Sequence, residues 1–210
     1  KIEEKNMTYS CYCSRREIKS RALKGVDGFI YPGTCENKYL KKKKLGNYAI
    51  RVKTENKIIS FDDTIQKKVQ ANIKDELGDF IIQRQDGIIS YQLAVVVDDY
   101  LDGITNVVRG SDLIFSTLRQ IYLNNLLKHP LPIYTHIPLA LDENDKKLSK
   151  SRDAPAINKD NPLPCLIKAW NFLKQEPIKE PIKNINDFWI MALSKWSERS
   201  IKDEAQINLI

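Results

Sequence analysis

The spacing of apolar residues first predicts a small β-sheet. Three short runs rich in β-branched and aromatic residues are separated by polar turns such as Asp86-Gly87. These runs occupy residues 48–52, 57–61 and 80–84. We therefore expect three strands in the first 85 residues.

After that sheet the apolar period changes from that of a strand to that of a helix. Apolar residues recur at i, i+3, i+4, i+7 and i+8, which defines one face of a helix. That face consists of Leu93, Val96, Val97, Tyr100 and Leu101. Ser90 is placed to cap the N-terminus of this helix, and Gly103 is placed just after its C-terminus.

Strands and helices then alternate. A β-branched run predicts a buried strand at 105–108, which ends at Arg109-Gly110, and a second apolar run predicts a strand at 133–139. Between them we expect a helix from a Thr117 cap to about Lys128. Alternation of this kind is typical of a parallel α/β sheet, and a polar loop at 142–151 follows it.

The last part of the chain has helical spacing. Two apolar stripes predict one helix each, and a linker with spaced prolines at 177–183 separates them. The stripes are Leu166, Trp170 and Leu173, and then Trp189, Leu193 and Trp196. We expect three parts: 1–85 with the small sheet, 86–151 with the α/β sheet, and 152–210 as a small helical lobe.

Composition indicates a globular protein of a reducing cytoplasm. Of the 210 residues, 42% are hydrophobic and 29% are charged, which argues against a disordered chain. The longest apolar run, at 188–193, is too short to span a bilayer. Four cysteines are too few for a disulfide scaffold, and Cys165 is expected to be a small core residue. The chain does not start with methionine, so we expect that it begins in mid-protein.

Positive charge is concentrated in one region. Residues 11–60 hold 13 Lys or Arg and four Asp or Glu, a net charge of +9, whereas the whole chain carries +7. Such a basic region suits a polyanion such as nucleic acid. A solvated lysine-rich surface is the alternative, and for the run at 41–44 it is the favoured one.

The most specific short motif is Lys147-Leu148-Ser149-Lys150-Ser151 in the polar loop. Two ammonium groups three residues apart can close over a triphosphate and stabilise the charge that develops during displacement. Lysine–serine pairs are also common in plain surface loops. The position of this pair after a predicted α/β sheet favours the nucleotide.

Separate motifs in the same order resemble one enzyme family. They are the segment 91–99 (YQLAVVVDD), the segments 103–105 (GIT) and 107–110 (VVRG), and the pairs 116–117 and 119–120. Together they resemble the glutamyl-tRNA synthetase group of class I aminoacyl-tRNA synthetases. The residues of these motifs are most similar to those of the short paralogue of that group, which glutamylates queuosine, a modified anticodon base of tRNA(Asp). The resemblance runs from about Tyr9 to Ser151.

The resemblance implies a fold and a set of substrate contacts. It implies the second half of a Rossmann-like catalytic domain with a zinc-bearing insertion and a small C-terminal helical lobe. By this resemblance, Tyr91 and Arg109 would contact glutamate. The segment 147–151 would be the ATP loop, in which Lys147 and Lys150 would contact the nucleotide. An arginine at the end of a sheet strand can grip a carboxylate with two hydrogen bonds. From the residues alone, an ion pair of Arg109 with Asp98 or Asp112 is as good an interpretation as a contact with glutamate. For Tyr91, a half-buried position in the core is a better interpretation than a substrate contact.

The resemblance also implies a zinc site made of Cys11, Cys13, Tyr31 and Cys35. Zinc prefers four N, S or O ligands in a tetrahedron, although tyrosine is an unusual one. From the residues alone, an interpretation as three free thiols and an unrelated turn is equal to an interpretation as a metal site. His129 and His136 lie far from the cysteines in the sequence, and we interpret both as structural.

Together these features predict an ATP-dependent ligase with Zn²⁺, Mg²⁺, glutamate, ATP and queuosine-containing tRNA(Asp) as cofactors and partners, in a monomeric cytoplasmic protein away from the membrane. The His-Ile-Gly-His-type motif of class I synthetases does not occur in the chain, so we expect this fragment alone to be inactive. Two alternatives remain: a shortened glutamyl-tRNA synthetase that charges tRNA(Glu), and a non-catalytic zinc-binding RNA module.

Overall fold

The computed structural model describes residues 2–36, 47–142, 145–148, 156–179 and 181–208. It divides into two compact units. The first unit comprises Lys1–Asp62, Lys68–Val107 and Leu113–Tyr134, and the second comprises Asp63–Lys67, Val108–Asp112 and Thr135–Ile210.

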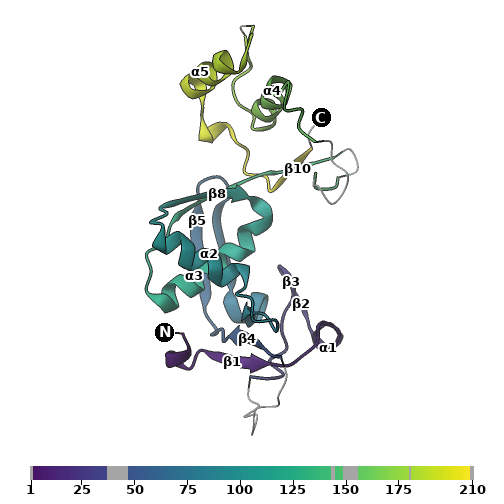
Figure 1. Cartoon of the computed structure of the whole chain (residues 1–210), viewed down its shortest axis with the longest axis vertical. Coiled ribbons are helices and arrows are strands. Elements are labelled where there is room, and N and C mark those ends of the chain that lie inside the picture. The colour runs from purple at the N-terminus through teal and green to yellow at the C-terminus, as the bar shows by residue number, and fades with distance from the viewer. Residues whose placement is uncertain (1, 37–46, 143–144, 149–155, 180, 209–210) are drawn as a thin grey trace. The chain divides into compact units, whose positions relative to one another are not determined.

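Strands and helices both contribute to the fold (Figure 1). The strands are β1 (Thr8–Cys11), β2 (Lys24–Gly25), β3 (Gly28–Phe29), β4 (Ala49–Val52), β5 (Ile58–Asp63), β6 (Lys67–Asn72), β7 (Phe80–Gln83), β8 (Asn106–Gly110), β9 (Ile133–Ile137), β10 (Leu139–Leu141) and β11 (Gln206–Asn208). The α-helices are α1 (Arg15–Arg21), α2 (Tyr91–Leu101), α3 (Ile114–Leu127), α4 (Leu163–Phe172) and α5 (Ile185–Lys195). Short helical turns are η1 (Glu3–Lys5), η2 (Ile73–Leu77), η3 (Ser111–Leu113) and η5 (Glu198–Ser200).

Two of the three predicted strands form a three-stranded sheet with β1, and its centre is β4. The order is β1-β4-β7, and both pairings are antiparallel. Along β7, Phe80 and Ile82 are buried while their neighbours are only partly covered, as the two-residue period of a strand requires. The strands predicted at 48–52 and 80–84 are therefore confirmed within one residue.

The strand predicted at 57–61 is β5, and it pairs with β6, which the sequence pattern did not indicate. The first residues of β6 are Lys67 and Lys68, so no apolar run marks its start. The chain reverses between the two strands because the Asp63 carboxylate accepts hydrogen bonds from the backbone N–H groups of Ile65 and Gln66 at 3.0 and 2.8 Å.

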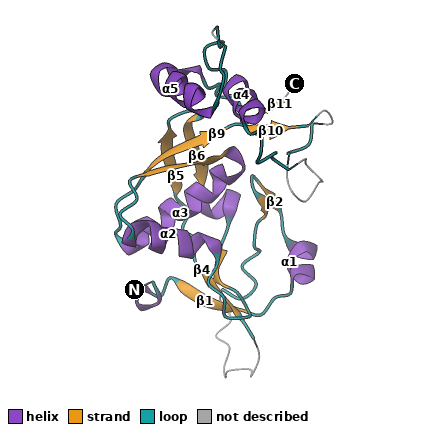
Figure 2. Ribbon diagram, turned by 45° about the horizontal axis from the view of Figure 1, so that its top comes forward, coloured by secondary structure: helices purple, strands orange, loops and turns teal. Residues whose placement is uncertain are grey.

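Two helices complete the first unit, and Figures 1 and 2 both draw them side by side. The helix predicted after Ser90 is α2, and Gly103 follows its end with φ +68°, a conformation that glycine adopts without strain. Ser90 is the N-cap residue, as predicted, but its hydroxyl donates to the carbonyl of Ile81 at 2.7 Å and makes no capping hydrogen bond. The second predicted helix is α3, which begins three residues before Thr117. Thr117 is therefore an interior residue and not a cap.

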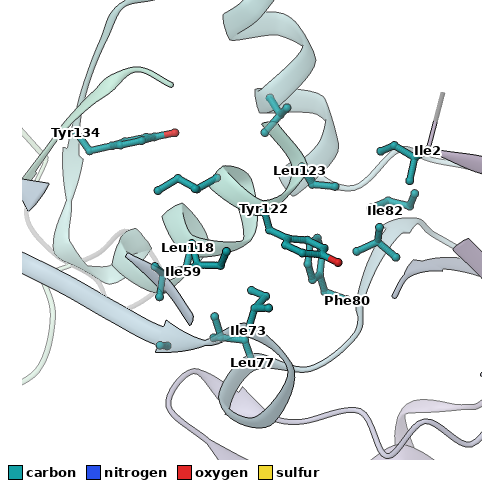
Figure 3. Close-up of a cluster of buried hydrophobic side chains, with 14 residues drawn as sticks. Ile2, Ile59, Ile73, Leu77, Phe80, Ile82, Leu118, Tyr122, Leu123 and Tyr134 are labelled. Carbon is teal, nitrogen blue, oxygen red and sulfur yellow. The ribbon is translucent and has the colours of Figure 1, made fainter. Parts of the chain in front are cut away.

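The core of the first unit lies between these helices, the strands and η2. Figure 3 shows Leu118, Tyr122 and Leu123 meeting side chains of the strands and of η2. The buried members are Ile2, Val52, Ile59, Ala71, Ile73, Leu77, Phe80, Ile82, Val96, Leu118, Ile121, Tyr122, Leu123 and Tyr134. Gly78 ends η2 with φ +69°, and a Cβ there would lie 2.7 Å from the side chain of Ile30, so no other residue fits at this close approach.

The alternating part of the chain forms smaller sheets than the pattern predicts. Strands β8 and β9 form a two-stranded sheet, and β10 pairs in parallel with β11. The strand predicted at 133–139 divides into β9 and β10 at Pro138, which has no N–H to donate to a ladder. The strand predicted as buried at 105–108 is largely exposed, since Val108 keeps 67% of its surface.

The helical lobe is present as α4 and α5, which bury Trp170, Phe188 and Ala192 against each other. The apolar stripe that located the second helix lies largely at the surface, since Leu193 is 82% exposed and Trp189 and Trp196 are about half exposed. Cys165 is also exposed and is not a core residue. The pattern identified the helices correctly but not the buried side of the second one.

Candidate functional site

The three cysteines and the tyrosine predicted as zinc ligands lie together in the first unit. The sulfur atoms of Cys11, Cys13 and Cys35 all lie within 4.8 Å of one another. The Tyr31 hydroxyl oxygen lies 3.4 Å from the sulfur of Cys11 and 3.5 Å from that of Cys13, and the sulfurs of Cys13 and Cys35 are 3.6 Å apart. Together with Tyr31, these cysteines form what we call the cysteine cluster.

The three distances of 3.4 to 3.6 Å are close to those between donors of a tetrahedral zinc site. Zinc–sulfur and zinc–oxygen bonds of about 2.3 and 2.0 Å place two sulfurs about 3.8 Å apart, and a sulfur and an oxygen about 3.5 Å apart. The donor set, three thiols and a phenol, is one that a borderline-soft cation accepts. The three cysteines form a group that could hold a metal ion, and zinc as that ion stays a prediction.

Local structure brings the cluster together. Cys11 ends β1, where it pairs with Ala49. The chain then turns into α1 through a capping box, in which the Ser14 hydroxyl accepts from the N–H of Glu17 and the Glu17 carboxylate accepts from the N–H of Ser14. Tyr31 and Cys35 belong to one turn, and the Cys35 N–H donates to the Tyr31 hydroxyl at 3.0 Å.

Arginines surround the cluster. The guanidinium of Arg51 lies over the ring of Tyr31, 3.8 Å from its centroid, and donates to the carbonyl of Asp79 at 2.8 Å. Arg15, Arg51 and Arg84 help to line a cavity of about 410 Å³ beside Cys11 and Cys13. Asp86 also lines this cavity and pairs with Arg84 at 2.6 Å, so the acid offsets part of the positive charge there.

Two members of the cluster, the Tyr31 phenol and the Cys13 thiol, have a raised pKa. Burial raises the pKa of the Tyr31 phenol, and its hydrogen bonds to the three thiols raise it further. Burial also raises the pKa of the Cys13 thiol. Burial has the same effect on Cys35, but hydrogen bonds from Tyr31, from the backbone of Tyr12 and from Cys13 outweigh it and lower the pKa of that thiol. A metal ion would therefore have to displace protons on binding.

The two residues predicted to contact glutamate belong to different units. Tyr91 is the first residue of α2 in the first unit and is about half exposed. Arg109 lies near the end of β8 in the second unit. Their convergence on one small acid stays a prediction.

Arg109 is held by a buried histidine. Its Nε donates to Nε2 of His136 at 3.1 Å. The other ring nitrogen of His136, Nδ1, lies 2.6 Å from Oδ2 of Asp63, and both of these side chains are fully buried. Asp112, one alternative partner for Arg109, is paired instead with the Lys147 ammonium at 2.5 Å. His136 is buried and hydrogen-bonded on both ring nitrogens, and its interpretation as a structural residue stays a prediction. The sequence pattern did not indicate Asp63 as its partner.

The predicted ATP loop is described only at its start. Leu148 donates its backbone N–H to the carbonyl of Ala140 at 2.9 Å, and Lys147 forms a bridge with Leu141, so the start of the loop lies beside β10. Ser149, Lys150 and Ser151 lie outside the described residues, as does the lysine run at 41–44. The roles of these residues stay predictions.

Comparison with protein families identifies the class. A family model described as "tRNA synthetases class I (E and Q), catalytic domain" matches residues 2–178. The chain therefore belongs to the catalytic-domain family of the class I tRNA synthetases for glutamate and glutamine, and the predicted class I synthetase fold, mixed α and β, is confirmed.

Curated relatives narrow the comparison to one kind of synthetase. A protein named Glutamyl-Q tRNA(Asp) synthetase from Janthinobacterium sp. (strain Marseille) is 41% identical over 200 residues, which cover 93% of this chain and 68% of that protein. One of the same name from Acinetobacter baylyi is 44% identical over 174 residues, 83% of this chain and 54% of that protein. The chain thus spans about half to two thirds of the relatives it matches.

Solved structures agree on the fold. A glutamate tRNA ligase from Elizabethkingia meningosepticum, in complex with its amino acid, superimposes with a TM-score of 0.70 over 100% of this chain and 48% of its own, at 19% identity. At that identity the likeness concerns the fold alone. Among the described residues, no helix has the length and apolar character needed to cross a membrane.

Proposed function

We propose that the chain is part of an enzyme that activates glutamate with ATP and transfers it to the queuosine base of tRNA(Asp). The names of the relatives at 41% and 44% identity support this substrate and acceptor. The observation that carries the proposal is the guanidinium of Arg109, which Nε2 of His136 holds near the end of β8. A fixed guanidinium at a strand end is suited to bind a carboxylate substrate.

The proposed reaction has two steps. A carboxylate oxygen of glutamate attacks the α-phosphorus of ATP, the bond to the β-phosphate breaks, and glutamyl-adenylate and pyrophosphate form. A hydroxyl of the cyclopentene diol of queuosine then attacks the acyl carbon, and AMP leaves. Positioning of the reactants and stabilisation of phosphate charge would supply most of the rate enhancement.

Arg109 and Tyr91 would hold glutamate. The carboxylate that reacts must keep its oxygen available as a nucleophile, so Arg109 would bind the carboxylate that does not react. Charge-assisted hydrogen bonds of this kind are about twice as strong as neutral ones. The Tyr91 hydroxyl would orient the substrate, since it is a polar group on a side chain with few rotatable bonds.

The segment 147–151 would hold ATP. Lys147 and Lys150 would contact the phosphates, with Leu148, Ser149 and Ser151 forming the rest of the loop. The pairing of Lys147 with Asp112 gives its ammonium a resting partner, which a triphosphate would replace. Mg²⁺ bound to ATP would supply neutralisation of the leaving pyrophosphate.

The cysteine cluster would hold Zn²⁺ in a structural role. Its four donors come from β1, from the start of α1 and from the turn that contains Tyr31 and Cys35, so a bound ion would tie these segments together. The arginines around the adjoining cavity would face phosphates of the RNA.

The test is glutamate transfer by the full gene product that carries this chain. We expect radiolabelled glutamate to be incorporated into tRNA(Asp) that contains queuosine, and not into tRNA(Asp) that lacks it. Charging of tRNA(Glu) in its place would identify the shortened glutamyl-tRNA synthetase. Absence of glutamate-dependent exchange of pyrophosphate into ATP would leave the non-catalytic RNA module.

A further inference from the structure

The chain contains a buried pair of side chains behind the proposed carboxylate-binding arginine. We propose that Asp63 and His136 are positioning residues that fix the guanidinium of Arg109 for end-on binding of a carboxylate through its two terminal nitrogens. The inference rests on the proposed function, in which Arg109 binds glutamate.

The position of Asp63 is fixed by several donors. Its carboxylate accepts the backbone N–H groups of Ile65 and Gln66 at 3.0 and 2.8 Å, and that of His136 at 3.0 and 3.1 Å to its two oxygens. Oδ2 also lies 2.6 Å from Nδ1 of the His136 ring. Burial alone would raise the pKa of Asp63, but these hydrogen bonds outweigh it and lower that pKa. Asp63 is therefore an ionised acceptor at neutral pH.

An ionised Asp63 determines the tautomer of His136. The ring nitrogen beside the carboxylate, Nδ1, must carry a proton, because a carboxylate offers only acceptors. In the neutral ring Nε2 then has a lone pair, and the Nε–H of Arg109 donates to it at 3.1 Å. An imidazolium would instead turn an N–H toward the guanidinium, which has no acceptor. The contacts thus fit one arrangement of protons.

This arrangement selects how Arg109 can bind a carboxylate. A guanidinium can form a two-bond fork side-on, through Nε and one terminal nitrogen, or end-on, through both terminal nitrogens. The contact to His136 occupies Nε, so a carboxylate cannot bind side-on through that nitrogen. It also fixes the plane of the guanidinium, because both His136 and Asp63 are fully buried and cannot turn with the substrate.

Two substitutions distinguish a His136 that positions Arg109 from a His136 that only packs in the interior. His136→Gln places an amide oxygen near the position of Nε2, so the acceptor for Arg109 is retained. His136→Asn places its amide near the position of Nδ1, so it retains the contact with Asp63 and loses the one with Arg109. The two variants are of similar polarity, and both leave a smaller side chain in the same buried place.

The first readout is pyrophosphate exchange by the full gene product. We expect His136→Asn to raise the KM for glutamate about tenfold, the loss typical of one weakened charge-assisted contact, with the KM for ATP changed less than about twofold. His136→Gln should raise the KM for glutamate less than about threefold. Equal losses in the two variants, or a parallel rise in the KM for ATP, would show that His136 only supports the fold and would overturn the inference.

The second readout does not depend on activity. In ¹⁵N NMR of the same protein at pH 7, with the His136 signals assigned by their loss in His136→Gln, we expect a protonated Nδ1 and an unprotonated Nε2. A ring protonated at Nε2 would overturn the inference. If the wild-type protein shows the expected tautomer but no exchange with glutamate, the proposed function fails and the positioning of Arg109 stands.

Discussion

At the scale of single residues, two groups of side chains define the chemistry of this chain. The cysteine cluster brings three sulfur atoms to within 4.8 Å of one another, beside the Tyr31 hydroxyl. Arg109, His136 and Asp63 form a continuous line of hydrogen bonds from the protein interior to a guanidinium. In both groups, burial removes water and makes each polar contact more directional.

Loss of one thiol should release the metal. In the chain purified with zinc, Cys13→Ser and Cys35→Ser should each lower the bound zinc from about one equivalent to a small fraction, because a serine hydroxyl replaces a thiolate ligand. Zinc content measured by mass spectrometry checks this.

The matched control for those variants is Cys165→Ser. Cys165 is an exposed thiol outside the cluster, so this variant should keep its zinc. Equal zinc content in all three variants would exclude the cysteine cluster as the zinc site.

At the scale of elements, α2 and α3 carry the core of the first unit, and the two helices differ in how they are buried. Of α2, only Val96 is fully buried, whereas α3 buries most of its middle turns. The short strands of the adjoining sheet contribute alternate residues to the same cluster (Figure 3). Stability should therefore depend more strongly on α3 than on α2.

Shortening one leucine in each helix tests this difference. Leu118→Ala in α3 should lower the free energy of unfolding by about 3 to 5 kcal/mol, because it opens a cavity at a fully buried position. Leu101→Ala in α2, where the side chain is 72% exposed, should lower it by less than about 0.5 kcal/mol. Urea denaturation of the chain measures both values, and similar losses would contradict the assignment of the core.

At the scale of the whole molecule, the notable property is the uneven charge. The net charge of residues 11–60 is +9, while the whole chain carries +7. The described part of that region includes α1, whose Arg15 and Arg16 are exposed, and the cavity beside the cysteine cluster. This region is the surface that we expect to meet tRNA phosphates.

Removal of positive charge from residues 11–60 should lower the affinity for tRNA and make that affinity depend less on the salt concentration. The double variant Arg15→Gln with Arg16→Gln should bind tRNA about tenfold more weakly at 0.15 M salt. The slope of log affinity against log salt should also decrease by about 1.5, as expected for two lost phosphate contacts.

The control has the same change of charge elsewhere. Lys168→Gln with Lys174→Gln alters two exposed lysines of the helical lobe and should leave the slope unchanged. Fluorescence anisotropy with labelled tRNA over a range of salt concentrations measures both variants. Equal slopes would show that the basic region is only a solvated surface.

The sequence alone determined the type and place of most elements and the family. Helical spacing located α2, α4 and α5, and β-rich runs located β4, β5 and β7, because these periods follow from the geometry of the backbone. The motifs at 91–99 and 107–110 indicated the synthetase class, which the family comparison confirms. The four residues of the cysteine cluster were also identified, although from their match to a family pattern and not from spacing alone.

Only the tertiary structure decided what each face of an element contacts. Trp189 and Leu193 have the spacing of a buried stripe but are exposed, while Phe188 beside them is buried. Asp63 and His136 are 73 residues apart and join in one buried pair. Burial and hydrogen bonding between distant segments depend on how the whole chain packs, whereas local periodicity depends only on neighbouring residues.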